Sequence, residues 1–306
     1  MKFVEAGGVR VSAIGLGTWQ FASREWGYGA EYAQTTAPAL VRRALELGIT
    51  LIDTAEAYGG GDSERIVGSA LRDAAREPFV ATKFTPVLPV ASVMVDHAER
   101  SRDRLDLAAI DLYQLHFANP LVPVARQAAG LAVLLDRGLA RHVGVSNHSL
   151  GRWQALERSL GRPVVSNQVE LNLARPRALR DLVPYAIAQD RLVIAYSPLG
   201  QGILAASEPP RRNGARLIRR VMGAPSWSNA ASLRVAIAEV ATAHGATPAQ
   251  VALAWLIGQP NVVAIPGART VEQLEENVRA ADLELSAGTL DHLTNVSARV
   301  ADRRRR

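Results

Sequence analysis

Residues 50–83, TLIDTAEAYGGGDSERIVGSALRDAAREPFVATK, contain the unit that decides the fold. Thr50–Asp53 and Phe79–Lys83 are short apolar runs, as expected for parallel strands buried on both faces. Between them we predict a helix over Glu64–Arg76, because Ser63 is a good N-cap residue and a proline follows the segment. This stretch therefore predicts one strand–helix–strand unit of the parallel type.

The same alternation continues along the chain. Six further runs are predicted as strands: Ala13–Gly17, Asp111–His116, His142–Ser146, Val164–Glu170, Leu192–Ser197 and Val262–Pro266. Capping residues and glycines mark further helices: Ala37–Leu47, Leu150–Leu160, one from Thr247-Pro248 to Gly258, and one that begins with a capping box over Thr270–Gln273. Eight such units in 306 residues match an α/β (β/α)8 TIM barrel, with an open doubly wound sheet as the alternative. We expect one domain over 1–306, with a short N-terminal hairpin at Gly7-Gly8 and long βα loops.

The composition excludes several other classes of protein. The chain is 48% hydrophobic and 21% charged, which is typical of a globular protein. It has no cysteine, which excludes disulfides, thiol catalysis and cysteine-ligated metal sites. No run approaches the ~20 apolar residues of a membrane span, and the start does not resemble a signal peptide. We therefore expect a cytoplasmic protein that does not bind membranes.

The basic residues are unevenly distributed between arginine and lysine. Lysine and arginine total 35 against 29 acidic residues, for a formal net charge of +6. Four of these charges lie in Arg303–Arg306, which we interpret as a solvated tail, so we expect no nucleic-acid partner. Only Lys2 and Lys83 are lysines, and the other 33 are arginines. A genome that favours arginine codons explains the arginines, but it does not explain Lys83.

Four ionisable side chains are predicted to meet where the strands end, which is where such barrels carry their active sites. Asp53, Lys83 and His116 end three neighbouring strands, and Tyr58 follows in a glycine-rich loop. A lysine ammonium lowers the pKa of a nearby tyrosine, a carboxylate keeps that ammonium charged, and a histidine polarises a carbonyl oxygen. Lysine suits this role because its charge is compact, whereas a guanidinium is a wide fork. Each residue alone also fits a structural role, but their joint placement predicts proton transfer to a carbonyl.

A second candidate site lies in the last third of the chain. The run Val262–Thr270 passes from a strand through Gly267 and Arg269 into a capped helix. Free N–H groups at a helix start and an arginine favour a phosphate, which barrels commonly bind after strands seven and eight. A plain turn with a surface arginine is the alternative. No metal-ligand motif occurs in the sequence, so we expect no metal.

Ten fragments, in order and at barrel spacing, resemble the aldo-keto reductase family, in particular its bacterial branches. They are Gly15–Trp19, Asp53–Gly59, Ser63-Glu64, Ala81–Lys83, Asp111–His116, Gly144–Asn147, Asn167–Glu170, Tyr196–Gly200, Ile265–Gly267 and Gln273–Asn277. The resemblance covers nearly the whole chain. It implies a TIM barrel that uses NADPH, without a metal, for the reversible reduction of an aldehyde or ketone.

The resemblance also implies residue roles. Tyr58 would be the general acid, tuned by Lys83 and Asp53, and His116 would orient the carbonyl. The implied cofactor site comprises Thr18, Trp19, Asp53, Ser146, Asn147, Gln168, Tyr196, Ser197, Leu199, Gly200, Pro266, Gly267, Arg269, Gln273 and Asn277. The implied substrate pocket comprises Trp19, Trp26, Tyr58, Phe84, His116 and Phe117. Gly267 stands where many members have lysine, while Phe117 and Asn119 stand where tryptophan and aspartate are frequent.

Two other functions remain as alternatives. One is a regulatory, cofactor-binding barrel similar to the potassium-channel β-subunits. The other is a lyase that forms a Schiff base on Lys83, although Asp53 argues against it because pairing keeps the amine protonated. The expected partner is a small carbonyl compound, whose identity the residues do not give, and a monomer is the default oligomeric state. We expect the long loop Ala205–Asn229, which holds five arginines, to fold over the cofactor as a lid.

Overall fold

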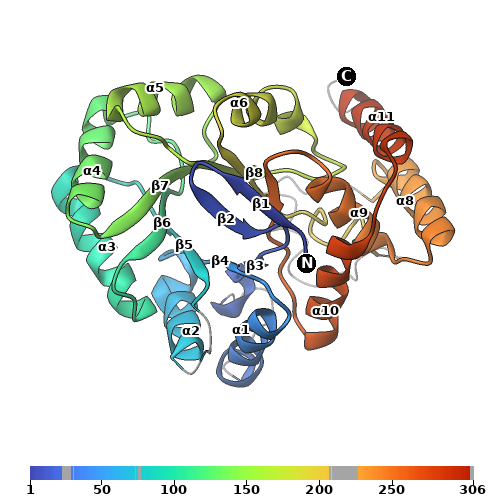
Figure 1. The fold of residues 1–306 in the computed structure, drawn as a ribbon, viewed down its shortest axis with the longest axis horizontal. Coiled ribbons are helices and arrows are strands. Elements are labelled where there is room, and N and C mark those ends of the chain that lie inside the picture. The colour runs from blue at the N-terminus through green and yellow to red at the C-terminus, as the bar shows by residue number, and fades with distance from the viewer. Residues whose placement is uncertain are drawn as a thin grey trace.

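The computed structural model of the protein describes residues 1–22, 31–72, 77–206 and 227–303, together with residues 29, 74 and 208. Eight parallel strands form one sheet in the order β10-β9-β8-β7-β6-β5-β4-β3. An isolated parallel bridge between Ile14 and Ala264 joins the first strand to the last and closes the sheet into a barrel. Helices surround this barrel on all sides (Figure 1). The prediction of a (β/α)8 TIM barrel is confirmed, and the closed sheet excludes the doubly wound alternative.

The observed strands overlap the predicted ones, with ends that differ by no more than three residues. They are β3 (Leu16–Gly17), β4 (Leu51–Asp53), β5 (Phe79–Phe84), β6 (Ile110–Leu115), β7 (Ala140–Ser146), β8 (Ser166–Glu170), β9 (Leu192–Tyr196) and β10 (Val262–Ala264). Because neighbouring strands pair in parallel, the carboxyl ends of all eight lie at one end of the barrel. The candidate site residues lie at that end.

The helices follow the strands in the expected alternation. They are α1 (Ala37–Glu46), α2 (Asp62–Leu71), α3 (Ala91–Leu105), α4 (Val124–Asp136), α5 (Leu150–Leu160), α6 (Leu182–Ala188), α8 (Ala231–His244), α9 (Pro248–Ile257), α10 (Val271–Arg279) and α11 (Ala287–Arg303). Short helical turns are η1 (Trp19–Ala22), η3 (Tyr32–Thr36), η4 (Tyr58–Gly61), η5 (Arg177–Leu179) and η6 (Ala280–Asp282). The capping hydroxyl predicted at Thr247 is present, and reciprocal hydrogen bonds between Thr247 and Gln250 extend it to a full capping box.

One predicted helix start is wrong. The helix was expected to begin after Ser63, but α2 begins at Asp62, after Gly61 in the left-handed conformation. The Ser63 hydroxyl does not cap the helix because it is engaged elsewhere: it lies 2.8 Å from the Thr18 hydroxyl and accepts a hydrogen bond of 3.0 Å from Thr54. These bonds connect Thr18, which follows β3, to Thr54, which follows β4, below the candidate site.

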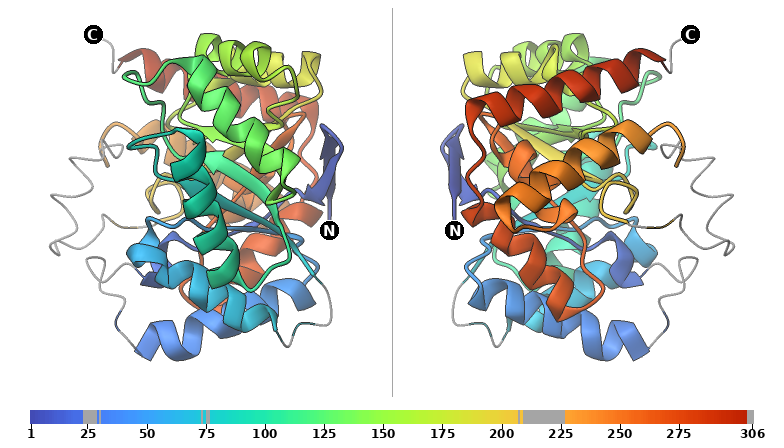
Figure 2. Two further views of the ribbon diagram at one scale, coloured as in Figure 1. Left: turned by 90° about the vertical axis from the view of Figure 1, so that its left-hand side faces the viewer. Right: turned by 90° about the vertical axis from the view of Figure 1, so that its right-hand side faces the viewer.

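The predicted N-terminal hairpin is present as an antiparallel pair of strands, and it covers the opposite end of the barrel. Its strands are β1 (Phe3–Ala6) and β2 (Val9–Ser12). Ala6, Val9 and Val11 are buried against residues that point into the barrel from several strands, including Leu112. Figure 2 shows this hairpin as a flat plate at one end of the molecule. The barrel interior is therefore covered at its amino-terminal end.

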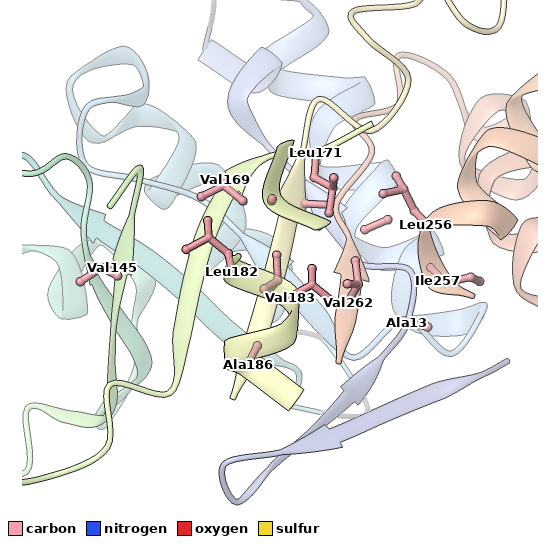
Figure 3. Close-up of a cluster of buried hydrophobic side chains, with 14 of the residues drawn as sticks. Ala13, Val145, Val169, Leu171, Leu182, Val183, Ala186, Leu256, Ile257 and Val262 are labelled. Carbon is pink, nitrogen blue, oxygen red and sulfur yellow. The ribbon is translucent and has the colours of Figure 1, made fainter. Parts of the chain in front are cut away.

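The main hydrophobic core lies between the barrel and the helices. Figure 3 shows part of it, where Leu182 and Val183 of α6 belong to the same buried cluster as Ile257 of α9 and Val262 of β10. Burying one such side chain contributes roughly 1.5–3 kcal/mol relative to leaving it exposed. This packing fixes the strands whose ends carry the candidate site.

Candidate active site

The four ionisable residues predicted to form a cluster are together at the carboxyl end of the barrel. Asp53 ends β4, Lys83 lies near the end of β5, and His116 directly follows β6. Tyr58 is the first residue of η4, in the loop after β4. The register of the parallel strands brings these positions side by side, because β4 pairs with β5 and β5 with β6.

Lys83 is the centre of this cluster. Its Nζ donates hydrogen bonds to Asp53 Oδ1 at 2.6 Å, to the Thr54 carbonyl at 2.8 Å and to the Tyr58 hydroxyl at 3.1 Å. The side chain is fully buried, so all three ammonium protons are satisfied by the protein itself. Asp53 Oδ2 accepts a further hydrogen bond of 2.6 Å from Gln168 Nε2.

The loop that returns Tyr58 to the site depends on three consecutive glycines. Gly59–Gly61 have φ angles of 60°, 66° and 94°, in the left-handed region that favours glycine. A Cβ on the first would collide with Ala22, and a Cβ on the last would lie 2.6 Å from Nε of Arg104. Glycine therefore allows both the sharp turn and the close packing of η4 on its neighbours.

Burial and charge act in opposite directions on the pKa values in this cluster. Burial raises the pKa of the Tyr58 phenol, and the Lys83 ammonium lowers it by less. Burial lowers the pKa of Lys83, but the Asp53 carboxylate and the Tyr58 hydroxyl together more than offset this, so that its pKa is raised. The ammonium therefore stays charged at neutral pH. Lys83 thus lowers the pKa of Tyr58 in the predicted direction, but desolvation exceeds this effect, so the pKa of Tyr58 is raised overall.

His116 is held in its neutral form beside Tyr58. Burial, assisted by the Lys83 charge, lowers the pKa of His116 to about 3. Its ring lies 5.9 Å from the Tyr58 ring, edge to face, and stacks on Phe117 at 4.4 Å between ring centroids. A neutral imidazole carries one N–H donor. The site thus holds two hydrogen-bond donors, the phenol and the imidazole, next to a buried cation.

A second polar cluster lies beside the first, at the ends of β7, β8 and β9. It consists of Ser146, Asn147, Gln168 and Tyr196. Ser146 Oγ donates to the Gln168 carbonyl at 2.9 Å, and Asn147 Nδ2 donates to Ser146 Oγ at 3.0 Å. The Tyr196 hydroxyl donates to Asn147 Oδ1 at 3.0 Å. Burial, with Glu170 nearby, raises the pKa of Tyr196 to about 12. These groups form one connected polar surface beside the Asp53–Lys83 pair.

The proposed phosphate region contains two tight turns. After β9, Ser197 and Gly200 have positive φ angles of 49° and 59°. After β10, the exposed Arg269 precedes α10, whose N-cap Thr270 accepts a hydrogen bond from the Gln273 backbone. The Gln273 side chain accepts from the Arg269 backbone at 2.9 Å, so the predicted capping box is only half formed.

The remaining predicted residues lie in different settings. Thr18, Pro266 and Asn277 are buried, and Leu199 is partly buried against the core. The Thr18 hydroxyl donates to the Asp53 carbonyl at 2.9 Å. Trp19 is half-buried on η1. Trp26 lies outside the described residues, as does most of the predicted lid over 205–229.

Phe84 does not line the predicted substrate pocket. The sequence predicted it to line the substrate pocket, but its side chain is fully buried and packs edge to face against His97 at 5.1 Å. Phe84 follows Lys83 on β5, and successive residues of a strand point to opposite faces. Its ring therefore lies in the core between the strand and α3.

Two neighbours of the site were missed from sequence. Glu56 ties the Tyr58 loop to the rest of the site, since Oε1 accepts from the Thr85 backbone at 2.6 Å and Oε2 lies 2.7 Å from His97 Nδ1. Its place two residues before Tyr58 was the available signal. Gln20 lies against Gly267, where a Cβ would be 2.6 Å from its Oε1. A side chain at position 267 would therefore have to displace the Gln20 amide, which donates to the Ala268 carbonyl.

The comparisons with known proteins agree with this geometry. The profile of the "Aldo/keto reductase family" matches residues 13–298. An uncharacterised oxidoreductase of Mycobacterium tuberculosis is 51% identical over 300 residues, covering 97% of this chain and 93% of that protein. Methylglyoxal reductase of Escherichia coli is 33% identical over 287 residues, covering 93% and 90%. A Klebsiella pneumoniae aldo/keto reductase, solved with NADP and acetate, is 30% identical with a TM-score of 0.80, covering 97% and 95%.

Proposed function

Because this chain belongs to the aldo/keto reductase family, we propose that it is an NADPH-dependent reductase that converts an aldehyde or ketone to an alcohol with Tyr58 as the acid. The observation that carries the proposal is the hydrogen bond of 3.1 Å from the buried Lys83 ammonium to the Tyr58 hydroxyl, with neutral His116 beside it. Among the described residues, no helix is both long and apolar enough to cross a membrane.

The chain's own groups explain how a proton reaches the substrate oxygen. As negative charge develops on a carbonyl oxygen, Tyr58 gives up its proton and becomes a phenolate. The Lys83 ammonium stabilises this phenolate, and Asp53 keeps the ammonium charged. The neutral His116 donates a second hydrogen bond to the same oxygen, as oxyanion-binding groups do.

The donor set of the site fits NADPH. A carboxamide needs both donors and acceptors, which Ser146, Asn147 and Gln168 provide, and the Tyr196 ring offers a flat face for a nicotinamide. The turn at Ser197–Gly200 and the start of α10 offer backbone N–H groups to phosphates. When bound, NADPH supplies the hydride that reduces the carbonyl carbon. We infer that Arg269, with Gln273 and Asn277, holds the adenosine 2′-phosphate end.

The mouth of the site favours substrates with an apolar body. Phe117 is half-exposed beside His116, and Val87, Leu88 and Leu121 are exposed on the loops that follow β5 and β6. These loops, over 85–90 and 117–123, contain no charged residue. Apolar surface of this kind stabilises an aromatic or alkyl group by removing it from water. An aromatic aldehyde is therefore the first substrate to test.

The lyase alternative is disfavoured by the bonds of Lys83. A Schiff base requires a neutral amine with a free lone pair. The Lys83 amine instead donates to three acceptors, and its pKa is raised by Asp53 and Tyr58 despite burial.

The direct test mixes the purified protein with NADPH and an aromatic aldehyde. The decrease in NADPH absorbance measures the oxidation of the nucleotide. Turnover that depends on both components is the expected result. Tight retention of NADPH without turnover of any aldehyde or ketone would favour a regulatory barrel instead.

Replacing Arg269 with alanine is expected to weaken NADPH binding about thirtyfold and to leave NADH binding unchanged, because a charge-assisted hydrogen bond to a phosphate is lost. Quenching of tryptophan fluorescence measures both affinities. Arg279→Ala is the matched control, since Arg279 is exposed at the other end of α10. Equal weakening of both nucleotides in Arg269→Ala would place the 2′-phosphate elsewhere.

The pH profile of reduction should show no ionisation of His116. With a pKa of about 3, His116 stays neutral from about pH 5 to pH 8, so its charge does not change across the range in which free histidine titrates. We expect His116→Gln to lower kcat without changing the shape of its pH profile. An inflection near the pKa of free histidine that disappears in His116→Gln would contradict the neutral state.

A further inference from the structure

We propose that Asn119 is a specificity-determining residue: its side-chain amide joins the loops after β5 and β6 and holds an apolar rim in place for substrates with an extended apolar body. The inference rests on the function proposed above and deepens it. The rim consists of Val87, Leu88, Phe117 and Leu121, which are exposed on these two loops. Asn119 acts on the substrate through these side chains and is therefore a positioning residue.

The Asn119 side chain uses its full hydrogen-bonding capacity between the two loops. Its Nδ2 donates to the Pro86 carbonyl at 2.8 Å and to the Val87 carbonyl at 3.1 Å. Its Oδ1 accepts from the backbone N–H of Leu121 at 2.7 Å and of Val122 at 3.1 Å. An asparagine amide has two donor protons and two acceptor lone pairs, so all four are engaged. One side chain therefore bonds the backbone of both loops.

The chemistry of these partners fixes the direction of the amide. Its partners on the loop after β5 are carbonyls, which only accept, and its partners on the loop after β6 are N–H groups, which only donate. An amide turned the other way would set acceptors against acceptors and donors against donors. An ionised aspartate has nearly the same shape but has no proton for the carbonyls of Pro86 and Val87. The junction between the loops thus depends on an amide.

The backbone of Asn119 is anchored to two helices. Its carbonyl accepts from Gln127 Nε2 of α4 at 3.1 Å and from Arg152 Nη1 of α5 at 3.3 Å. Gln127 is buried, and its Nε2 also donates to the Val122 carbonyl at 2.8 Å. The loop after β6 is therefore fixed to the helices around the barrel. The Asn119 side chain extends this anchorage to the loop after β5.

The bonded backbone groups belong to the most exposed residues of the rim. Val87 and Leu121 are 81% and 89% exposed, more than any other large apolar side chain among the described residues. Asn119 bonds directly to the carbonyl of the first and to the N–H of the second. A binding surface that is ordered before its ligand arrives loses less conformational freedom on binding. The amide thus prepares the rim for an apolar group.

The rim is continuous with the proton-transfer groups but is held independently of them. His116 and Phe117, whose rings stack, come just before Asn119 in the chain. The bonds of Asn119 reach loops and helices instead of the Lys83 ammonium or the Tyr58 hydroxyl. Losing the amide should therefore weaken the binding of an apolar substrate and leave the chemical step intact.

The first variant is Asn119→Asp, which keeps both acceptor bonds but sets an oxygen against the two carbonyls. We expect KM for naphthaldehyde, which has an extended apolar body, to rise about tenfold because two hydrogen bonds are lost, with kcat within about twofold. For propanal, which has little apolar surface to bury, KM and kcat should both change by less than about twofold. A loss that lies in kcat, or that is as large for propanal, would overturn the proposal, as would unchanged kinetics.

Asn261→Asp is the matched control. Asn261 is also partly buried, and its Nδ2 also donates to two backbone carbonyls, those of Ala186 at 3.3 Å and Arg191 at 3.0 Å. It directly precedes β10, at the amino-terminal end of the barrel. Its substitution should lower the melting temperature and leave the ratio of the two KM values unchanged. The same change of this ratio in both variants would mean that Asn119 only stabilises the fold, which would overturn the proposal.

A second measurement needs neither cofactor nor substrate. Backbone hydrogen exchange, read by mass spectrometry, reports separately on peptides over 85–90 and 117–123. Asn119→Asp loses its bonds to the first of these loops, so exchange there should become at least about threefold faster. Unchanged exchange over 85–90 would show that the amide does not hold this loop and would overturn the proposal.

Asn119→Ala completes the test, because it removes all four side-chain bonds without adding a charge. It should produce the same rise in KM for naphthaldehyde and faster exchange in both loops, even if Asn119→Asp does not fold. Equal kinetics of Asn119→Ala and the wild type with both aldehydes would overturn the proposal. If the wild type reduces no carbonyl, the proposed function fails, while the exchange measurement still decides whether Asn119 joins the two loops.

Discussion

Tyr58→Phe should lower kcat/KM for carbonyl reduction about a thousandfold. General acid catalysis by a positioned side chain contributes roughly 10²–10⁴-fold, and the Tyr58 hydroxyl, which the Lys83 ammonium contacts, is the proposed acid. The substitution removes the proton donor while keeping the ring. Steady-state kinetics with an aromatic aldehyde and NADPH measure the effect.

Binding of NADPH provides the control for Tyr58→Phe. The nucleotide is proposed to lie on groups from β7 to β10, so its affinity should change by less than about threefold, which fluorescence quenching reports. Tyr185→Phe is a matched variant, since the Tyr185 hydroxyl bonds to Glu157 at 2.7 Å on the outer helices. Equal activity in the wild type and in Tyr58→Phe would show that the acid is a different group.

Lys83→Arg should lower kcat/KM by about a hundredfold or more and also destabilise the fold. The Lys83 side chain is fully buried, and its ammonium fits among three acceptors at 2.6–3.1 Å. A guanidinium is larger and planar, and overpacking of this kind costs roughly 1–3 kcal/mol. The free energy of unfolding in urea and the kinetics of reduction measure the two effects.

Lys2→Arg is the natural control for Lys83→Arg. Lys2 is the other lysine of the chain and is exposed near the N-terminus. Its replacement should change neither stability nor activity measurably. If Lys83→Arg also changed neither stability nor activity, the rarity of lysine in this chain would have no connection with catalysis.

The sequence was sufficient to predict the barrel and the meeting of the four ionisable residues. Strands buried on both faces leave continuous apolar runs, and the carboxyl ends of parallel strands lie at one end of a barrel. Asp53, Lys83 and His116 therefore had to meet once the strands were recognised. The approach of Tyr58 to these three residues was harder to predict from the sequence, because it depends on the turn at Gly59–Gly61.

Other features depend on three-dimensional surroundings that a sequence does not display. Ser63 has the residue type of an N-cap, yet its hydroxyl bonds to Thr18 and Thr54. Phe84 stands next to Lys83 in sequence but points to the opposite face of β5. The net direction of the Tyr58 pKa depends on how much water burial removes, and that quantity requires coordinates. The roles of the residues proposed to hold NADPH stay predictions until they are tested.

The plate formed by β1 and β2 has a kinetic consequence. Among the described residues, the hairpin covers one end of the barrel interior, so we expect both reactants to enter from the other end. Gln168 and Asp53 lie deeper there than the exposed Phe117 and Leu121. A molecule seated on the deeper groups must arrive first and leave last. Turnover should thus follow a compulsory order, with the nucleotide first on and last off, visible as competitive product inhibition between the two nucleotide forms.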